Sequence, residues 1–127
     1  MPDHSFDSSH PRIEEERLDG VELFVLGGEF DAFSSPLVEA ALLPAIERGE
    51  YQIVVDLTQV TFMDMSTIYA IVRAIKSVYQ HNGHLVVVSS SRPVLRIIDL
   101  AGMRHAIPVV ATREEALAQM GPRPAAA

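Results

Sequence analysis

The feature that most limits the possible folds is a nearly unbroken apolar run in the middle of the chain. Tyr51–Leu57 contains Ile53, Val54, Val55 and Leu57. A run of this kind is typical of a strand covered on both faces, as in the centre of a parallel sheet. No apolar run approaches the roughly 20 residues that a membrane-spanning helix needs. The chain is therefore expected to build a sheet around this strand.

Strand-like and helix-like segments alternate on both sides of this run. In chain order, apolar spacing and turn signals predict a strand pair over 12–18 and 21–26, a helix over 34–48, a strand over 51–57, a helix over 66–82, a strand over 85–88, a helix over 91–102, a strand over 107–110 and a helix over 112–120. Alternating strands and helices form mostly parallel sheets, whereas the Asp19-Gly20 connection is typical of an antiparallel hairpin. The expected fold is an α/β mixed sheet, mostly parallel with an N-terminal antiparallel edge hairpin, packed with about four helices.

Three local features are expected to interrupt these elements. Gly27-Gly28 ends the second strand, and residues 58–64 form a turn after the buried run. Pro44 has no N–H to bond the carbonyl of Ala40, so a kink or an early end of the first helix is expected there. All three expectations rest on local sequence alone.

The composition fits one folded domain. Of the 127 residues, 48% are hydrophobic and 21% are charged, and none is Cys, which excludes disulfides and thiolate metal sites. The formal net charge of −7 argues against nucleic-acid binding, which needs a basic face. We expect residues 1–11 to be a disordered leader, 12–120 the domain and 121–127 a disordered tail. With neither a signal core nor a membrane span in view, a cytoplasmic protein is expected.

The motifs of several common enzyme classes are missing. The phosphate-binding patterns GxxxxGK[ST] and GxGxxG and the hydrolase pattern GxSxG do not occur. His81 and His84 have a spacing seen in metal sites, but the two residues between them break the helix, so a solvated helix end is favoured. Asp56 and Asp64 resemble a carboxylate pair, yet local spacing ties no His or Lys to either. We therefore predict no catalytic residue, no metal site and no cofactor.

The segment Asp64-Met65-Ser66 stands out because it connects the buried strand to the long amphipathic helix. An Asp or Ser at such a place is ordinarily an N-cap, worth about 1 kcal/mol. A hydroxyl at the carboxyl end of a central strand also lies where open α/β sheets place their functional sites. The local pattern leaves both a capping role and a functional role open.

Three stretches carry a family pattern. They are Gly-Glu-Phe-Asp at 28–31, Val-Val-Asp-Leu at 54–57 followed by Val60 and Phe62-Met63-Asp64, and residues 93–103, which end in Gly102-Met103. Together they resemble the STAS domain of bacterial anti-sigma-factor antagonists, with Ser66 at the phosphoacceptor place of that family's Asp-Ser-Ser-Gly motif. The resemblance covers roughly residues 12–120 and implies a STAS-like mixed sheet.

The resemblance also implies a partner switch. In such families the unphosphorylated antagonist binds an anti-sigma factor that is also a serine kinase of GHKL-type fold, and this binding frees a sigma factor. Phosphorylation ends the interaction, and a PP2C-type phosphatase restores it. Carried onto this chain, the resemblance implies phosphorylation of Ser66 and partner contacts by Asp31, Asp64, Met65, Ser66 and Thr67. No direct contact with nucleic acid or membrane is implied.

Two residues depart from the family pattern. Met65 stands where a small polar residue is frequent, and Thr67 stands where Gly is usual, so Thr67 is a minor alternative acceptor.

Two other functions stay open. One is a non-switching scaffold that assembles with other STAS domains, and the other is a sensor that holds a nucleotide or another small ligand in the loops around Gly28–Asp31 and Asp64–Ser66.

A phosphate on Ser66 is expected to change binding more than folding. Phosphoserine carries about −1.5 to −2 charges, and at a helix N-terminus it meets the positive end of the dipole and free amides. A hundredfold loss of affinity needs only about 2.7 kcal/mol. Met65 suits a partner contact if it is exposed, with core packing as the equal alternative, whereas core packing is favoured for Met63.

Overall fold

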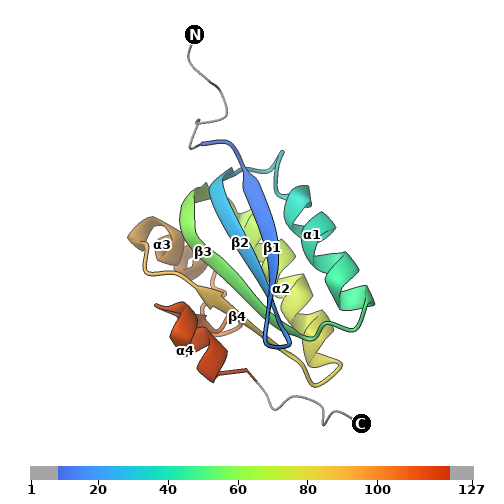
Figure 1. The fold of residues 1–127 in the computed structure, drawn as a ribbon. Coiled ribbons are helices and arrows are strands. Elements are labelled where there is room, and N and C mark those ends of the chain that lie inside the picture. The colour runs from blue at the N-terminus through green and yellow to red at the C-terminus, as the bar shows by residue number, and fades with distance from the viewer. Residues whose placement is uncertain (1–8, 121–127) are drawn as a thin grey trace, which may run out of the picture.

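The structure is a computed structural model that describes residues 9–120. Its elements are β1 (Arg12–Leu18), β2 (Val21–Phe30), α1 (Pro36–Glu47), β3 (Gln52–Met63), α2 (Met65–Tyr79), β4 (His84–Val88), α3 (Arg92–Leu100), β5 (Val109–Val110) and α4 (Arg113–Ala118). They form a five-stranded sheet in the order β1-β2-β3-β4-β5 (Figure 1). β1 and β2 are antiparallel, and all other neighbours are parallel. The predicted mixed sheet with an antiparallel edge hairpin and four helices is confirmed.

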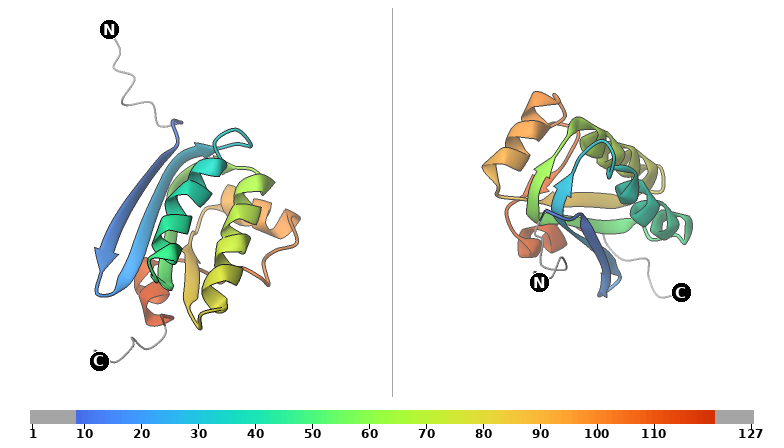
Figure 2. Two further views of the ribbon diagram at one scale, coloured as in Figure 1. Left: turned by 90° about the vertical axis from the view of Figure 1, so that its right-hand side faces the viewer. Right: turned by 90° about the horizontal axis from the view of Figure 1, so that it is seen from above.

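The sheet separates two hydrophobic layers of different size. The larger layer lies under α1, α2 and α3, and the smaller one lies on the opposite face under α4 (Figure 2). Val55 of β3 belongs to the larger layer, whereas Val54 faces the smaller one together with Ala116 of α4. The prediction that the run Tyr51–Leu57 is a strand covered on both faces is therefore confirmed.

Two strands are longer than predicted. β2 continues through Gly27-Gly28 to Phe30, and β3 continues through the predicted turn at 58–64 as far as Met63. The two extensions pair with each other across two register shifts, with Phe30 opposite Met63. Both local predictions are wrong because the backbone partner that satisfies each extension belongs to the other strand, which local sequence does not reveal.

Gly28 allows a further segment to approach the end of β2. Its φ is +85°, and a Cβ added there would lie 2.2 Å from the carbonyl oxygen of His10. The neighbouring N–H of Glu29 donates to the carbonyl of Ser9 at 3.0 Å. Residues 9–11, expected to belong to a disordered leader, therefore lie against β2. The rest of that leader and the predicted tail 121–127 lie outside the described residues.

The helices follow the predicted pattern with shifted ends. α1 continues through Pro44 to Glu47, so the predicted early end does not occur. Pro44 lies on the exposed side of α1, and the opposite side buries Val38, Leu42, Ala45 and Ile46 against the sheet, which outweighs one missing hydrogen bond.

In residues 9–120 no helix has the length and apolar character required to cross a membrane.

Candidate functional site

The predicted site residues lie where the ends of β2 and β3 meet. Phe30 closes β2 and pairs with Met63 at the end of β3. The backbone N–H of Asp64 donates to the carbonyl of Phe30 at 3.0 Å. Asp31 follows Phe30, and α2 begins at Met65. The segment after β2 and the segment after β3 therefore lie together at the carboxyl ends of these strands, although they are distant in sequence.

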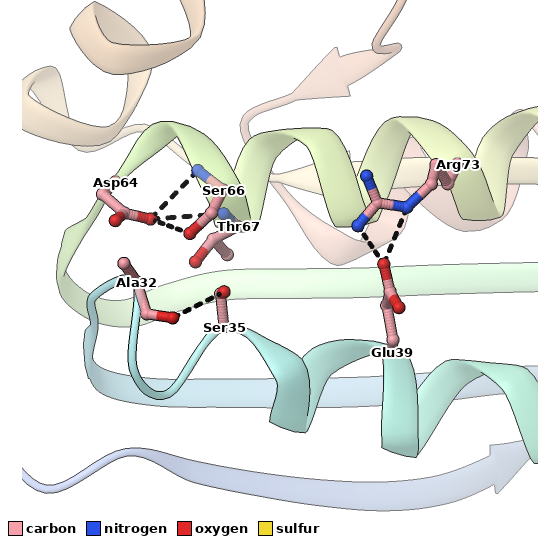
Figure 3. A network of polar contacts seen from close by, with 7 residues as sticks. All are labelled: Ala32, Ser35, Glu39, Asp64, Ser66, Thr67 and Arg73. Carbon is pink, nitrogen blue, oxygen red and sulfur yellow. Dashed lines mark hydrogen bonds and ion pairs between the residues drawn. The ribbon is translucent and has the colours of Figure 1, made fainter.

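Asp64 is the N-cap of α2 (Figure 3). Its Oδ1 accepts from the backbone N–H of Ser66 at 3.0 Å and of Thr67 at 3.3 Å. The same oxygen accepts from the Ser66 hydroxyl at 2.5 Å. The capping role that the sequence left open thus belongs to Asp64. Two of the amides expected to be free for a phosphate are already occupied.

Ser66 lies at the wall of a hollow between the starts of α1 and α2. The side chain is half-buried. The hollow has a volume of about 200 Å³ and is lined by Ser35, Pro36, Glu39, Ser66, Tyr69, Ala70 and Arg73. The Ser66 side chain therefore reaches a surface depression and is not sealed in the core.

An ion pair crosses this hollow. Arg73 of α2 donates through Nε to Glu39 Oε1 of α1 at 2.7 Å, and its Nη2 contacts the same oxygen (Figure 3). Nearby, the hydroxyl of Ser35 donates to the carbonyl of Ala32 at 3.3 Å. The side chains of Arg73 and Glu39 are 61% and 37% exposed, so solvent screening keeps the pair below about 1 kcal/mol.

Asp31 organises the turn between β2 and α1. Its Oδ1 accepts from the N–H of Ser34 at 2.9 Å, from the Ser34 hydroxyl at 2.9 Å and from the N–H of Phe33 at 3.0 Å. These hydrogen bonds, led by the backbone N–H of Ser34, hold the pKa of the Asp31 carboxyl below its ordinary value. Asp31 is nevertheless exposed, so its carboxylate combines a structural role with an accessible charge.

Three neighbours of Ser66 differ in exposure. Met65 is 40% exposed, whereas Met63 and Thr67 are buried. The hydroxyl of Thr67 donates to the carbonyl of Phe30 at 3.4 Å and links α2 to β2. Thr67 is predicted as a partner contact and as a minor acceptor, and the burial of its hydroxyl in the unmodified chain does not favour either role. The favoured core position of Met63 is confirmed.

Four exposed apolar side chains, called the apolar rim below, lie on the segments that form this site: Met65, which was predicted from the sequence as a partner contact, and Phe33, Phe62 and Tyr69, which were not. Phe33 is 95% exposed in the turn that Asp31 organises, and the other three are 40–46% exposed. Phe33 is an apolar residue in a polar turn, and no apolar residue at regular spacing accompanies it. This irregularity is the signal that could have indicated an exposed side chain. The site therefore combines two carboxylates and a hydroxyl with exposed apolar side chains.

Asp56 has no part in this site. Seven residues of extended strand separate it from Asp64, so the two carboxylates do not form a pair. Its carboxylate is buried, accepts from the N–H of Thr58 at 2.9 Å and contacts Arg113 Nε at 2.6 Å, which ties α4 to β3. Within residues 9–120 no three His, Asp or Glu side chains are grouped so that they could hold a metal ion.

Both the sequence and the fold of this chain are similar to those of known proteins. The STAS domain family model matches residues 12–116. The anti-sigma F factor antagonist of Paenibacillus polymyxa is 31% identical over 110 residues, which cover 86% of this chain and 94% of that protein. A crystal structure of an anti-sigma factor antagonist from Mycobacterium paratuberculosis has a TM-score of 0.77 at 23% identity, covering 88% of this chain and 95% of that one. Bacillus SpoIIAA in its phosphorylated form has a TM-score of 0.66 at 20% identity, covering 85% and 98%.

Proposed function

The chain belongs to the STAS domain family, and we propose that it is an anti-sigma-factor antagonist whose activity is switched at Ser66. The unphosphorylated form binds an anti-sigma factor that is also a serine kinase of GHKL-type fold, and a sigma factor is released in the cytoplasm. Phosphorylation of Ser66 ends this binding, and a PP2C-type phosphatase restores it. The similarity to the anti-sigma F factor antagonist of Paenibacillus polymyxa supports the antagonist role.

The observation that carries the proposal is the position of the Ser66 hydroxyl. Ser66 lies at the head of α2, at the wall of a hollow, and Asp64 holds its side chain by a hydrogen bond of 2.5 Å. Proposed partner contacts are Asp31, Asp64, Met65 and Ser66, with the apolar rim residues Phe33, Phe62 and Tyr69 beside them. The rim offers apolar contact area, and the two carboxylates offer charge recognition.

The same arrangement explains how one phosphate ends binding. A partner that covers the rim removes water from Ser66, and a dianion placed there loses its hydration. A partner carboxylate close to Ser66 would add direct repulsion. Either effect readily supplies the roughly 2.7 kcal/mol that corresponds to a hundredfold loss of affinity.

The first test is direct mapping of the modified residue. The purified chain is incubated with its cognate kinase and ATP, and the product is analysed by mass spectrometry. We expect phosphate on Ser66, none on Ser66→Ala, and unchanged incorporation on Ser35→Ala, which removes another hydroxyl of the same hollow. If no residue between Thr61 and Ser77 carries phosphate, the proposed switch is refuted. A stable complex that ATP does not change would point to a scaffold instead.

A further inference from the structure

Arg73 and Ser66 face the same hollow. They are seven positions apart on α2, which is close to two helical turns, so their side chains share one face of the helix. Helical side chains lean toward the N-terminus, which in α2 is the direction of Ser66. Figure 3 shows the guanidinium of Arg73 extended along α2 in this direction. Among the described residues that line the hollow, Arg73 is the only cation.

The capping geometry restricts where a phosphate on Ser66 can lie. The unmodified hydroxyl donates to Asp64, and phosphorylation replaces this donated hydrogen by an anionic group. The phosphate and the Asp64 carboxylate would then lie in contact and repel each other. The amides of Ser66 and Thr67 are not free for the phosphate, because they are already bonded to Asp64. A phosphate therefore gains little from the end of the helix and is driven away from Asp64. The open space that Ser66 lines is the hollow, which leads to Arg73.

We propose that Arg73 is the intramolecular binding partner of a phosphate on Ser66, and that it exchanges the Glu39 carboxylate for this phosphate. The inference rests on the proposed phosphorylation of Ser66. The existing pair is weak, because both side chains are more than a third exposed. A phosphate dianion has more charge and three acceptor oxygens, and it suits the planar donor fork of arginine better than a single carboxylate oxygen does.

The exchange changes the site in shape as well as in charge. Arg73 and Glu39 join α2 to α1, and loss of this contact leaves the Glu39 carboxylate without its cation. The guanidinium then lies over the half of the hollow next to Ser66. A partner that recognises the open hollow of the unmodified chain would meet a filled one, beside an α1 surface that is more negative.

The test uses phosphoserine placed at position 66 during translation, so that no kinase is needed. The second ionisation of the phosphate, ordinarily near pH 6, is followed by ³¹P NMR. Loss of a bound cation disfavours the dianion, so Arg73→Gln is expected to raise the titration midpoint by about 0.5 pH unit. Glu39→Gln is expected to lower the midpoint, because it frees Arg73 and removes a negative charge.

Lys76→Gln is the matched control. Lys76 is an exposed cation on the same helix but does not line the hollow, so its removal changes the net charge equally and is expected to leave the midpoint nearly unchanged. Equal midpoints for Arg73→Gln and Lys76→Gln would overturn the inference. A second readout in the otherwise native chain is the Nε–H signal of Arg73, which should shift when position 66 carries phosphate. Because the phosphate is installed without a kinase, failure here is distinct from failure of Ser66 to be phosphorylated.

Discussion

Asp64 and Asp31 perform the same local task at neighbouring turns. Each carboxylate accepts from two backbone N–H groups that the start of a helix or a turn leaves without partners. Each also accepts from a serine hydroxyl, Ser66 in one case and Ser34 in the other. The two aspartates therefore fix the local shape of the site in the free chain.

Removal of the Asp64 cap should weaken the fold measurably. Asp64→Ala leaves the N–H groups of Ser66 and Thr67 without their acceptor, and we expect a loss of about 1 kcal/mol in the free energy of unfolding. Asp64→Asn keeps a capping oxygen, so its free energy of unfolding should fall by only a few tenths of the loss expected for Asp64→Ala. Urea unfolding of the three proteins measures both values. Equal stability of Asp64→Ala and the native chain would show that the cap contributes nothing.

Glu22 is a second carboxylate with an unusual environment, at the far end of the sheet from the site. It is buried. Its Oε1 lies 3.3 Å from Arg17 Nη1, and its Oε2 lies 4.0 Å from Arg48 Nη2. Burial raises the pKa of Glu22 above its ordinary 4.5, aided by a hydrogen bond to Glu15 and by the charge of Glu50, while Arg17 opposes the rise. Ionised Glu22 is therefore less favourable in the folded chain than in the unfolded one.

This shift predicts a pH dependence with a definite sign. A carboxyl whose folded pKa is raised contributes stability below its unfolded pKa, and this contribution is lost as the pH rises through the folded value. Relative to Glu22→Gln, the native chain should therefore lose stability between pH 4 and pH 7. Urea unfolding at both pH values gives the comparison, and the exposed Glu16→Gln is the control. A native chain that gains stability relative to Glu22→Gln over this range would mean that Arg17 and Arg48 outweigh burial.

At the scale of elements, the order of strands and helices could be predicted but the strand ends could not. The apolar run at Tyr51–Leu57 and the spacing of α2 are local patterns, so they identify β3 and α2 directly. The extensions of β2 and β3 past Gly27-Gly28 and Leu57 depend on pairing with each other. Thr67 could have been placed correctly, because it lies one turn before Ile71 on the apolar face of α2. The exposure of Phe33 could have been suspected from its polar neighbours, but its position could not, since that depends on the turn made by Asp31.

Gly28 offers a test of how the segment 9–11 is held. Gly28→Ala adds a Cβ within 2.2 Å of the His10 carbonyl at a φ of +85°, so we expect a loss of more than about 2 kcal/mol. Gly49→Ala is a matched control, because Gly49 has a φ of +90° with open space around it and should cost only about 1 kcal/mol. Urea unfolding gives both values. Equal losses would show that the contact with His10 does not matter.

At the scale of the whole molecule, the site occupies one edge of a sheet whose two faces are both packed with helices. A phosphate on Ser66 would add charge to a surface depression, and Ser66 belongs to neither hydrophobic layer. We therefore expect the chain with phosphoserine at position 66 to unfold within a few degrees of the unmodified chain in a thermal melt, since surface changes rarely exceed about 0.5 kcal/mol. A melting temperature lowered by more than 10 °C would mean that the phosphate acts by unfolding the domain.

The most direct measurement is the dissociation constant for the anti-sigma factor that the unmodified chain captures from its native host. It is determined by calorimetry for the unmodified chain, for Ser66→Ala and for the chain carrying phosphoserine at position 66. We predict similar affinities for the first two and at least about a hundredfold weaker binding for the third, a difference of about 2.7 kcal/mol. Equal affinity of the phosphorylated and unmodified chains would contradict the switch at Ser66.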